Sequence, residues 1–435
     1  MKQQILYVVL TGLTVGLFVS QLSAQDTPQA FQGAEIIPIE GDVIEGGTLV
    51  VQDGIIQQVG ADDEVDIPDD AEVHDASDKV IMPGLVDTHS HVGEGDGGDQ
   101  SAALHPDVRI LDAINPQSDS FKRARTGGVT TANIMPGSGH LLSGQTVYVK
   151  YRDAATIYDM LLVDDIYEEV EGGMKMANGT NSIRQQGPFP GTRGKSAAMV
   201  REQFVQAEEY REQLRAAEED DDADPPSRNL QMEGLVEVLD GDRIVHFHTH
   251  THHDIMTAMR LSEEFGFRLV LQHVSEGWKV ADEIAEAGVP ASIIGLDSPG
   301  GKHEAVNLLY KLGPELEEAG ADVAYHTDDG ITDSRLFLRM AAYGVRAGMS
   351  REGALEALTI RGAEMMDLDD QIGSLVEGKD ADFILLDGDP FSVYTHVQET
   401  WIDGVQVYDR SNPDHYPYSV GGDEVNQGHI HSHFD

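Results

Sequence analysis

Histidines stand at the ends of several apolar, strand-like segments of this chain. The first pair, His89 and His91, is spaced at i and i+2, which places both imidazoles on one face of a strand. Residues 243–250, 268–273 and 321–329 also form apolar segments that end in histidine or aspartate, and helical patterns lie between them. Strands that alternate with helices favour parallel βα units. In a (β/α)8 barrel the carboxyl ends of the strands meet at one mouth, so residues distant in sequence would meet there.

These strand-end side chains predict a site for a divalent metal. Neutral imidazole is the commonest ligand of such ions, and an apolar strand has no packing reason to present two imidazoles on one face. The chain contains no cysteine, so thiolate sites and disulfides are excluded. The ligands must therefore be histidine, carboxylate or modified lysine.

The patterns predict an α/β chain with a central barrel and a small β-domain. The 435 residues are enough for one barrel of about 250 residues and a smaller second unit. Residues 81–367 are predicted to form the TIM-like (β/α)8 barrel, with an insertion at 171–224. Short strand patterns at 33–80 and 368–410 predict one β-sandwich domain built from both chain ends. Residues 411–435 are predicted to be a disordered polar tail.

The first 24 residues have the features of a secretory signal peptide. One lysine precedes an apolar stretch at 5–19, and small residues occupy positions 23 and 24. The stretch is short for a membrane span, although an uncleaved anchor is the alternative. We therefore expect an exported protein, periplasmic or extracellular, without stable membrane insertion after cleavage.

The net charge of −48 restricts the partners of this chain. A surface this acidic repels nucleic acid and anionic membranes, so nucleic-acid binding is excluded and a small-molecule substrate is expected. Self-repulsion of this size is screened at high salt, which favours a halophilic type of surface. The alternative is that the charge keeps an exported protein soluble. The chain could also form a homo-oligomer, although no interface can be identified from the sequence.

Four segments together resemble the metal-dependent amidohydrolase superfamily, and its imidazolonepropionase-like and prolidase-like branch. They are Pro-Gly-Leu-Val-Asp-Thr-His-Ser-His at 83–91, Pro-Gly-Ser-Gly-His at 136–140, His-Thr-Asp at 326–328 and the closing segment 372–382. The similarity covers about residues 33–410. It implies a metal-dependent barrel, with Zn²⁺ as the expected ion, and hydrolysis of carbon–nitrogen bonds.

The resemblance also implies roles for the strand-end residues. His89 and His91 would hold the more buried metal. His273 would serve as the ligand from the sixth barrel strand. Asp328 would be both a metal ligand and the proton shuttle, so Asp328 and His273 are the predicted catalytic residues.

The ligands from the fifth and fourth strands are less well defined. For the fifth strand, the resemblance favours His248 over His246 and His250, because the distance from His248 to the following helix matches the family pattern. For the fourth strand, carbamylated Lys175 could bridge two metals. Related sequences often carry glutamate at the position of Thr180, so the alternatives are one ion, or two ions with carbamylated Lys175. A Lys175 that only pairs with an acid is a third interpretation.

The substrate-binding candidates are His250, His140 and Lys302. Lys302 could bind a carboxylate, although a simple turn leading into the next helix is the alternative. The predicted function is hydrolysis of a cyclic amide, an N-acyl amino acid or a Xaa-Pro-type dipeptide, by a hydroxide that the metal generates from water. The alternatives are a deaminase of the same superfamily and a catalytically silent binding protein, for which the absence of glutamate at Thr180 is the one indication.

Overall fold

The computed structural model describes residues 27–93, 95, 97–163, 165–166, 169–220, 224–295 and 302–421. The predicted signal peptide, residues 1–24, lies outside the described residues. Within the described ranges, no helix combines the length and apolar character needed to span a bilayer.

Among the described residues, nine strands form the central part of the molecule. They are β6 (Leu85–Ser90), β7 (Val129–Ile134), β8 (Leu142–Gln145), β9 (Val147–Lys150), β10 (Met174–Ala177), β11 (Val245–Thr249), β12 (Leu269–His273), β13 (Ala291–Ile294) and β14 (Val323–His326). One sheet has the order β14-β13-β12-β11-β10-β8, and β10 to β14 are parallel neighbours. A second sheet has the order β6-β7-β9, in which β6 and β7 are parallel. Every residue of β12 is buried, which is typical of a parallel strand covered on both faces.

The two central sheets meet where β6 lies beside β14. An isolated parallel bridge joins Ser90, at the end of β6, to Asp329 in the loop after β14. The described strands do not form one closed hydrogen-bonded ladder. The fold is therefore an α/β arrangement that is consistent with a (β/α)8 barrel, and the closed barrel stays a prediction.

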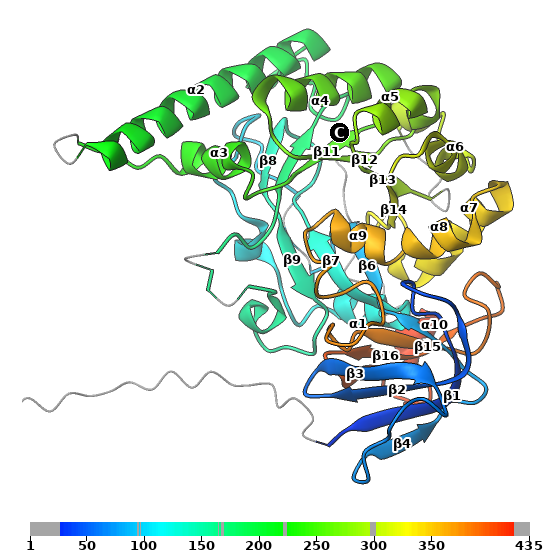
Figure 1. Cartoon of the computed structure of the whole chain (residues 1–435). Coiled ribbons are helices and arrows are strands. Elements are labelled where there is room, and N and C mark those ends of the chain that lie inside the picture. Colours follow the sequence, from blue (N-terminus) through cyan, green and yellow to red (C-terminus); the bar gives the residue numbers. More distant parts are fainter. Residues whose placement is uncertain are drawn as a thin grey trace, which may run out of the picture.

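Helices follow the parallel strands and cover them. They are α1 (Asp119–Thr126), α2 (Arg193–Glu219), α3 (Leu230–Asp240), α4 (His252–Phe265), α5 (Ala281–Glu286), α6 (Leu312–Ala319), α7 (Phe337–Ala347), α8 (Arg351–Glu356), α9 (Ile360–Glu364) and α10 (Tyr416–Val420). Figure 1 shows α4 to α7 following one another around the outside of β11 to β14. Local residues define their ends: Asn229 caps the start of α3, where its side chain accepts hydrogen bonds from two backbone N–H groups, and the left-handed Gly241 caps the end.

Short 3₁₀ helices occur in the connections. They are η1 (Ile110–Ala113), η2 (Ile157–Met160), η3 (Gly277–Lys279), η4 (His303–Ala305) and η5 (Ser334–Leu336). The last three follow β12, β13 and β14, at the end of the strands where the candidate site lies.

Two predicted boundaries are wrong. The insertion does not begin at residue 171, because β10 (Met174–Ala177) is a strand of the parallel sheet between β8 and β11. The resemblance already placed Lys175 on the fourth strand, but a strand of four residues was too short a signal to mark where the insertion begins. The tail is not disordered from residue 411, because residues 416–420 form α10, which contacts α1. Residues 422–435 lie outside the described part of the chain.

Strands from both chain ends form one further sheet. Its strands are β1 (Gln29–Ile36), β2 (Ile44–Gln52), β3 (Ile55–Ala61), β4 (Glu72–Asp75), β5 (Val80–Pro83), β15 (Phe383–Leu386), β16 (Val397–Ile402) and β17 (Val405–Asp409). The order is β17-β16-β15-β5-β1-β2-β3, with β4 beside β1, so the antiparallel pair β5–β15 joins the two chain ends. The rings of Phe31, Phe383 and Trp401 pack together across this sheet, at centroid distances of 5.0 to 5.6 Å. The sheet lies at the lower end of the molecule in Figure 1. Its arrangement as a sandwich domain stays a prediction.

Candidate metal centre

His89, His91 and Asp328 face one another where β6 and β14 end. His89 Nε2 lies 3.3 Å from His91 Nε2. Asp328 Oδ1 lies 3.4 Å from His89 Nε2 and 3.0 Å from His91 Nε2. The Asp328 N–H donates to the His89 carbonyl at 2.9 Å, which holds the loop after β14 against β6. All three side chains are buried, and two imidazoles with one carboxylate at these separations could bind a divalent ion.

His273 and His326 extend this group from the ends of β12 and β14. His326 Nε2 lies 3.0 Å from His273 Nδ1, and His326 Nδ1 lies 2.7 Å from Ser292 Oγ. The rings of His273 and His89 are 4.7 Å apart between centroids. Within the described residues, His273 Nε2 is buried and has no hydrogen-bond partner. An unpartnered buried imidazole nitrogen is what a metal ligand requires, so the residues present fit a divalent ion.

The backbone at two of these residues adopts an uncommon conformation. His273 has φ 69° and Asp328 has φ 51°, both in the left-handed region. Residues other than glycine rarely adopt this conformation, and such residues cluster at active sites and ligand-binding positions. At both strand ends, the surrounding structure therefore holds the chain in a conformation that local preference disfavours.

Lys175 projects from β10 into the same group of side chains. Its Nζ lies 3.1 Å from His89 Nε2 and 2.9 Å from Met135 Sδ. Burial lowers the pKa of Lys175 to about 7, although the negative charge of Asp328 opposes this shift. In the described part of the chain, Lys175 forms no ion pair with an acid, so the interpretation that it only pairs with an acid has no support. A lysine that is readily neutral is the form that carbamylation requires.

The three histidines of the β11 segment have different surroundings. Both ring nitrogens of His246 are occupied, because Nε2 lies 2.9 Å from the Tyr148 hydroxyl and Nδ1 lies 3.1 Å from Gln272 Nε2. The rings of His248 and His250 instead lie beside His273, at centroid distances of 4.4 and 5.0 Å. The structure thus brings His248 and His250 into the candidate centre and places His246 among other partners.

The remaining substrate-binding candidates lie in two different places. His140 is buried against the rings of His105 and Phe189, at centroid distances of 5.5 and 5.4 Å. Lys302 immediately precedes η4 and is partly buried. Burial lowers the pKa of His250 to about 3, and the positive charge of Lys302 adds to this shift. The charge of Lys302 thus acts on His250, whereas His140 belongs to a separate group of rings.

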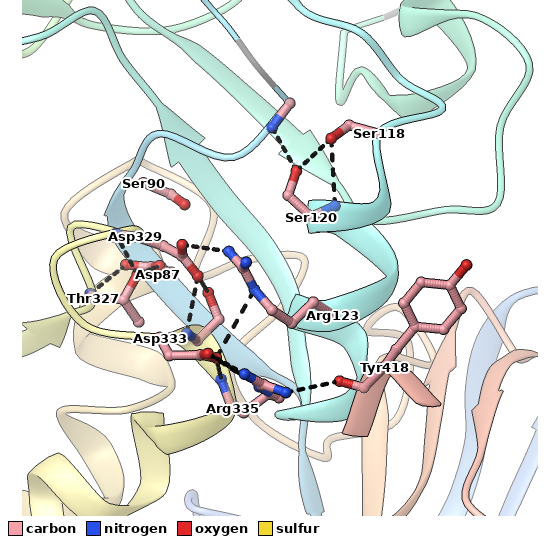
Figure 2. Close-up of polar contacts among 12 residues, drawn as sticks. Asp87, Ser90, Ser118, Ser120, Arg123, Thr327, Asp329, Asp333, Arg335 and Tyr418 are labelled. Carbon is pink, nitrogen blue, oxygen red and sulfur yellow. Dashed lines mark hydrogen bonds and ion pairs between the residues drawn. The ribbon is translucent and has the colours of Figure 1, made fainter. Parts of the chain in front are cut away.

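A polar network supports the loop that carries Asp328 (Figure 2). Asp87 accepts hydrogen bonds from the backbone N–H of Thr327 at 3.0 Å and of His89 at 3.3 Å. Asp329 accepts a hydrogen bond from Arg123 Nη2 at 2.6 Å, so its carboxylate faces α1 rather than the histidines. These residues hold the end of β6 and the loop after β14 in place, without contributing ligand atoms to the candidate centre.

Sequence reasoning did not identify Arg123 or Glu304 as site residues. Arg123 lies in α1, 206 residues before its partner Asp329, and nothing in a helical pattern predicts that pairing. Glu304 lies two residues after Lys302. One of its carboxylate oxygens lies within 4.8 Å of ring nitrogens of His248 and His250. A lone glutamate after a turn carries no signal of this kind in the sequence.

The buried histidines predict a loss of stability in acid for the metal-free protein. Burial lowers the pKa of His246, His250 and His326 to about 3 in the folded state. The unfolded chain binds these protons near pH 6.5, so their contribution to stability is complete above that pH and is lost as the pH falls from about 6.5 towards 3. We expect each of these histidines to lower the free energy of unfolding by roughly 1 kcal/mol at pH 5.5. Denaturant unfolding across pH 5–8 measures this, and His246→Gln should reduce the slope. A flat profile would contradict the prediction.

Comparison with known proteins decides the family. The sequence profile of the amidohydrolase family matches residues 80–408. The chain belongs to the amidohydrolase family. A solved amidohydrolase from Thermotoga maritima is 31% identical, with a TM-score of 0.81, and the match covers 88% of this chain and 100% of that one. The resemblance in the sequence is confirmed.

Two curated relatives match this amidohydrolase-family chain over less than half of their own length. "Amidohydrolase tasK" of Hapsidospora irregularis is 27% identical over 401 residues, which are 83% of this chain and 40% of the relative. "Enamidase" of Eubacterium barkeri is 33% identical over 141 residues, which are 31% of this chain and 36% of the relative. The chain thus spans less than half the length of these relatives. The family generally depends on metals and acts on carbon–nitrogen bonds, which agrees with the donor groups described above.

Proposed function

We propose that this protein is an exported, metal-dependent hydrolase that cleaves a carbon–nitrogen bond in a small-molecule substrate. The substrate would be a cyclic amide, an N-acyl amino acid or a Xaa-Pro-type dipeptide. The observation that carries the proposal is the buried contact of His89, His91 and Asp328, with His273 adjacent. Export rests only on the sequence of residues 1–24. Self-association of the chain is a further expectation that the family suggests.

The proposed ligands would hold either one ion or two. His89, His91 and Asp328 would hold the first. His248 and His273 would hold a second, and a carbamylated Lys175 would bridge the two. When bound, Zn²⁺ or a similar ion would polarise the substrate carbonyl and lower the pKa of water from about 15.7 to about 7.

Asp328 would move the protons of the reaction. Burial alone would raise the pKa of Asp328, but the hydrogen bond from His91 and the charges of His91 and Lys302 outweigh burial and hold the pKa below its ordinary value. The carboxylate is therefore ionised at neutral pH and can accept a proton from the attacking water. It can then pass that proton to the leaving nitrogen. Lys302, just before η4, and His250, just after β11, would orient the substrate.

Metal content is the measurement that tests this proposal. The protein, purified in high salt without chelator, should carry one or two ions by elemental mass spectrometry. Hydrolysis of N-acyl amino acids or dipeptides should be lost on chelation and restored by Zn²⁺. Release of ammonia from an aminated ring, in place of hydrolysis, would indicate a deaminase. Absence of bound metal after reconstitution would contradict the proposal and favour a catalytically silent fold.

A further inference from the structure

The loop after β13 inserts a carboxylate at the end of β10. Glu304 lies in η4 and is 6% exposed. Its Oε2 accepts a hydrogen bond from the backbone N–H of Thr180 at 2.7 Å. A Cβ atom at Gly179, which has φ 76°, would lie 2.6 Å from the same oxygen. Because Gly179 has no Cβ atom, there is room beside it for the Glu304 carboxylate.

Two imidazoles face this carboxylate. One ligand atom from each of His248, His250 and Glu304 lies within 4.8 Å of the others. His250 Nδ1 lies 2.7 Å from Ser275 Oγ, which orients the ring and leaves Nε2 to face the group. This bond from the opposite ring nitrogen is the arrangement that metal-binding histidines commonly show.

Among the described residues, one atom of His250 and one of Glu304 are buried without a partner. Within the described residues, neither His250 Nε2 nor Glu304 Oε1 has a hydrogen-bond partner. Both side chains are more than nine-tenths buried, at 6% exposed each. A buried polar atom left unpaired costs about 1–3 kcal/mol, and more when it is charged. A divalent cation between them would satisfy both atoms at once.

We propose that Glu304, His250 and His248 hold a divalent cation next to the His89–His91–Asp328 group. This inference rests on the proposed metal-dependent function and deepens it. It assigns the second ion to this group in place of the set of His248, His273 and carbamylated Lys175 given above. It also moves His250 from substrate orientation to metal binding. Two imidazoles and one carboxylate are an established ligand set for zinc that leaves a coordination position open. The Thr180 N–H would position this carboxylate. Lys175, which lies beside His89, would then serve the first ion alone and would not bridge the two.

The test is the number of ions bound by the full chain and three variants. Zn²⁺ bound after equilibration is measured by elemental mass spectrometry, and the two affinities by titration with Co²⁺ followed by visible absorption. We expect two ions for the unmodified protein and one for Glu304→Gln and for His250→Gln. Glutamine at position 304 keeps an oxygen that can accept the Thr180 hydrogen bond, so the loop contact is retained. We expect the affinity for the second ion to fall by at least the 10–100-fold typical of changes around a metal.

Glu171→Gln is the matched control. Glu171 is also a buried glutamate, 5% exposed, with one oxygen that lacks a hydrogen-bond partner among the described residues. Its variant should bind two ions. If Glu304→Gln and His250→Gln both keep two ions at unchanged affinity, or if Glu171→Gln loses one, the inference is wrong. One ion in the unmodified protein would overturn the inference alone, and none would overturn the metal-dependent function as well. If one variant fails to fold, by circular dichroism, the other still decides.

Discussion

Asp328→Asn is expected to slow hydrolysis by about 10²–10⁴-fold, the usual contribution of a general acid–base group. Asparagine is nearly the same size as aspartate, but it can neither accept the proton of the attacking water nor return one to the leaving nitrogen. It also removes the negative charge 3.0 Å from His91 Nε2. The loss should therefore fall mainly on kcat, measured by steady-state kinetics with the best substrate from the screen.

Two further measurements make this result interpretable. Metal content separates loss of the proton shuttle from loss of a ligand, and thermal unfolding shows whether the fold survives. Asp112→Asn is a suitable control, because Asp112 is exposed and pairs with Arg109 in a surface contact. An unchanged kcat in Asp328→Asn, with metal retained, would refute the assigned role.

Arg123→Met is expected to lower the free energy of unfolding by about 3–5 kcal/mol. Arg123 and Asp329 are 4% and 0% exposed, and Nη2 lies 2.6 Å from Oδ1. Removal of the guanidinium would leave a buried carboxylate without its counter-charge (Figure 2). The backbone carbonyl of Asp329 also accepts a hydrogen bond from the His91 N–H at 3.0 Å. Loss of the ion pair should therefore also disturb the position of His91 in the candidate centre.

Denaturant unfolding at one fixed salt concentration measures this effect. Lys122→Met is the matched control, since the neighbouring Lys122–Asp119 pair is 42% and 48% exposed and is expected to contribute at most about 1 kcal/mol. The double variant Arg123→Met with Asp329→Asn should recover part of the loss, because it removes the unpaired charge. Equal effects of Arg123→Met and Lys122→Met would show that burial does not strengthen the first pair.

The motifs that resemble the amidohydrolase superfamily were sufficient to predict the family, and the strand-end pattern predicted that His89, His91, His273 and Asp328 meet. The spacing of His89 and His91 places both on one face of β6, and parallel strands bring their carboxyl ends to one side of a sheet. His273 ends β12 and Asp328 follows β14, so their convergence with His89 results from the order of βα units. The family was confirmed by a profile match over residues 80–408. The convergence of these side chains depends on periodicity, which a single sequence contains, whereas the family prediction depended on the motifs.

Only the tertiary structure separated the three histidines of the β11 segment. A period of two residues places His246, His248 and His250 on the same face, so periodicity could not distinguish them, and the preference for His248 came from the family resemblance alone. Contacts with Tyr148 and Gln272 occupy His246, whereas the other two lie beside His273.

The same limit applies to Glu304 and to Arg123, whose partners are 124 and 206 residues away in the chain. Periodicity determines which face of a strand or helix a residue occupies. Which side chain it meets across that face depends on packing between distant segments, and that information exists only in the folded chain.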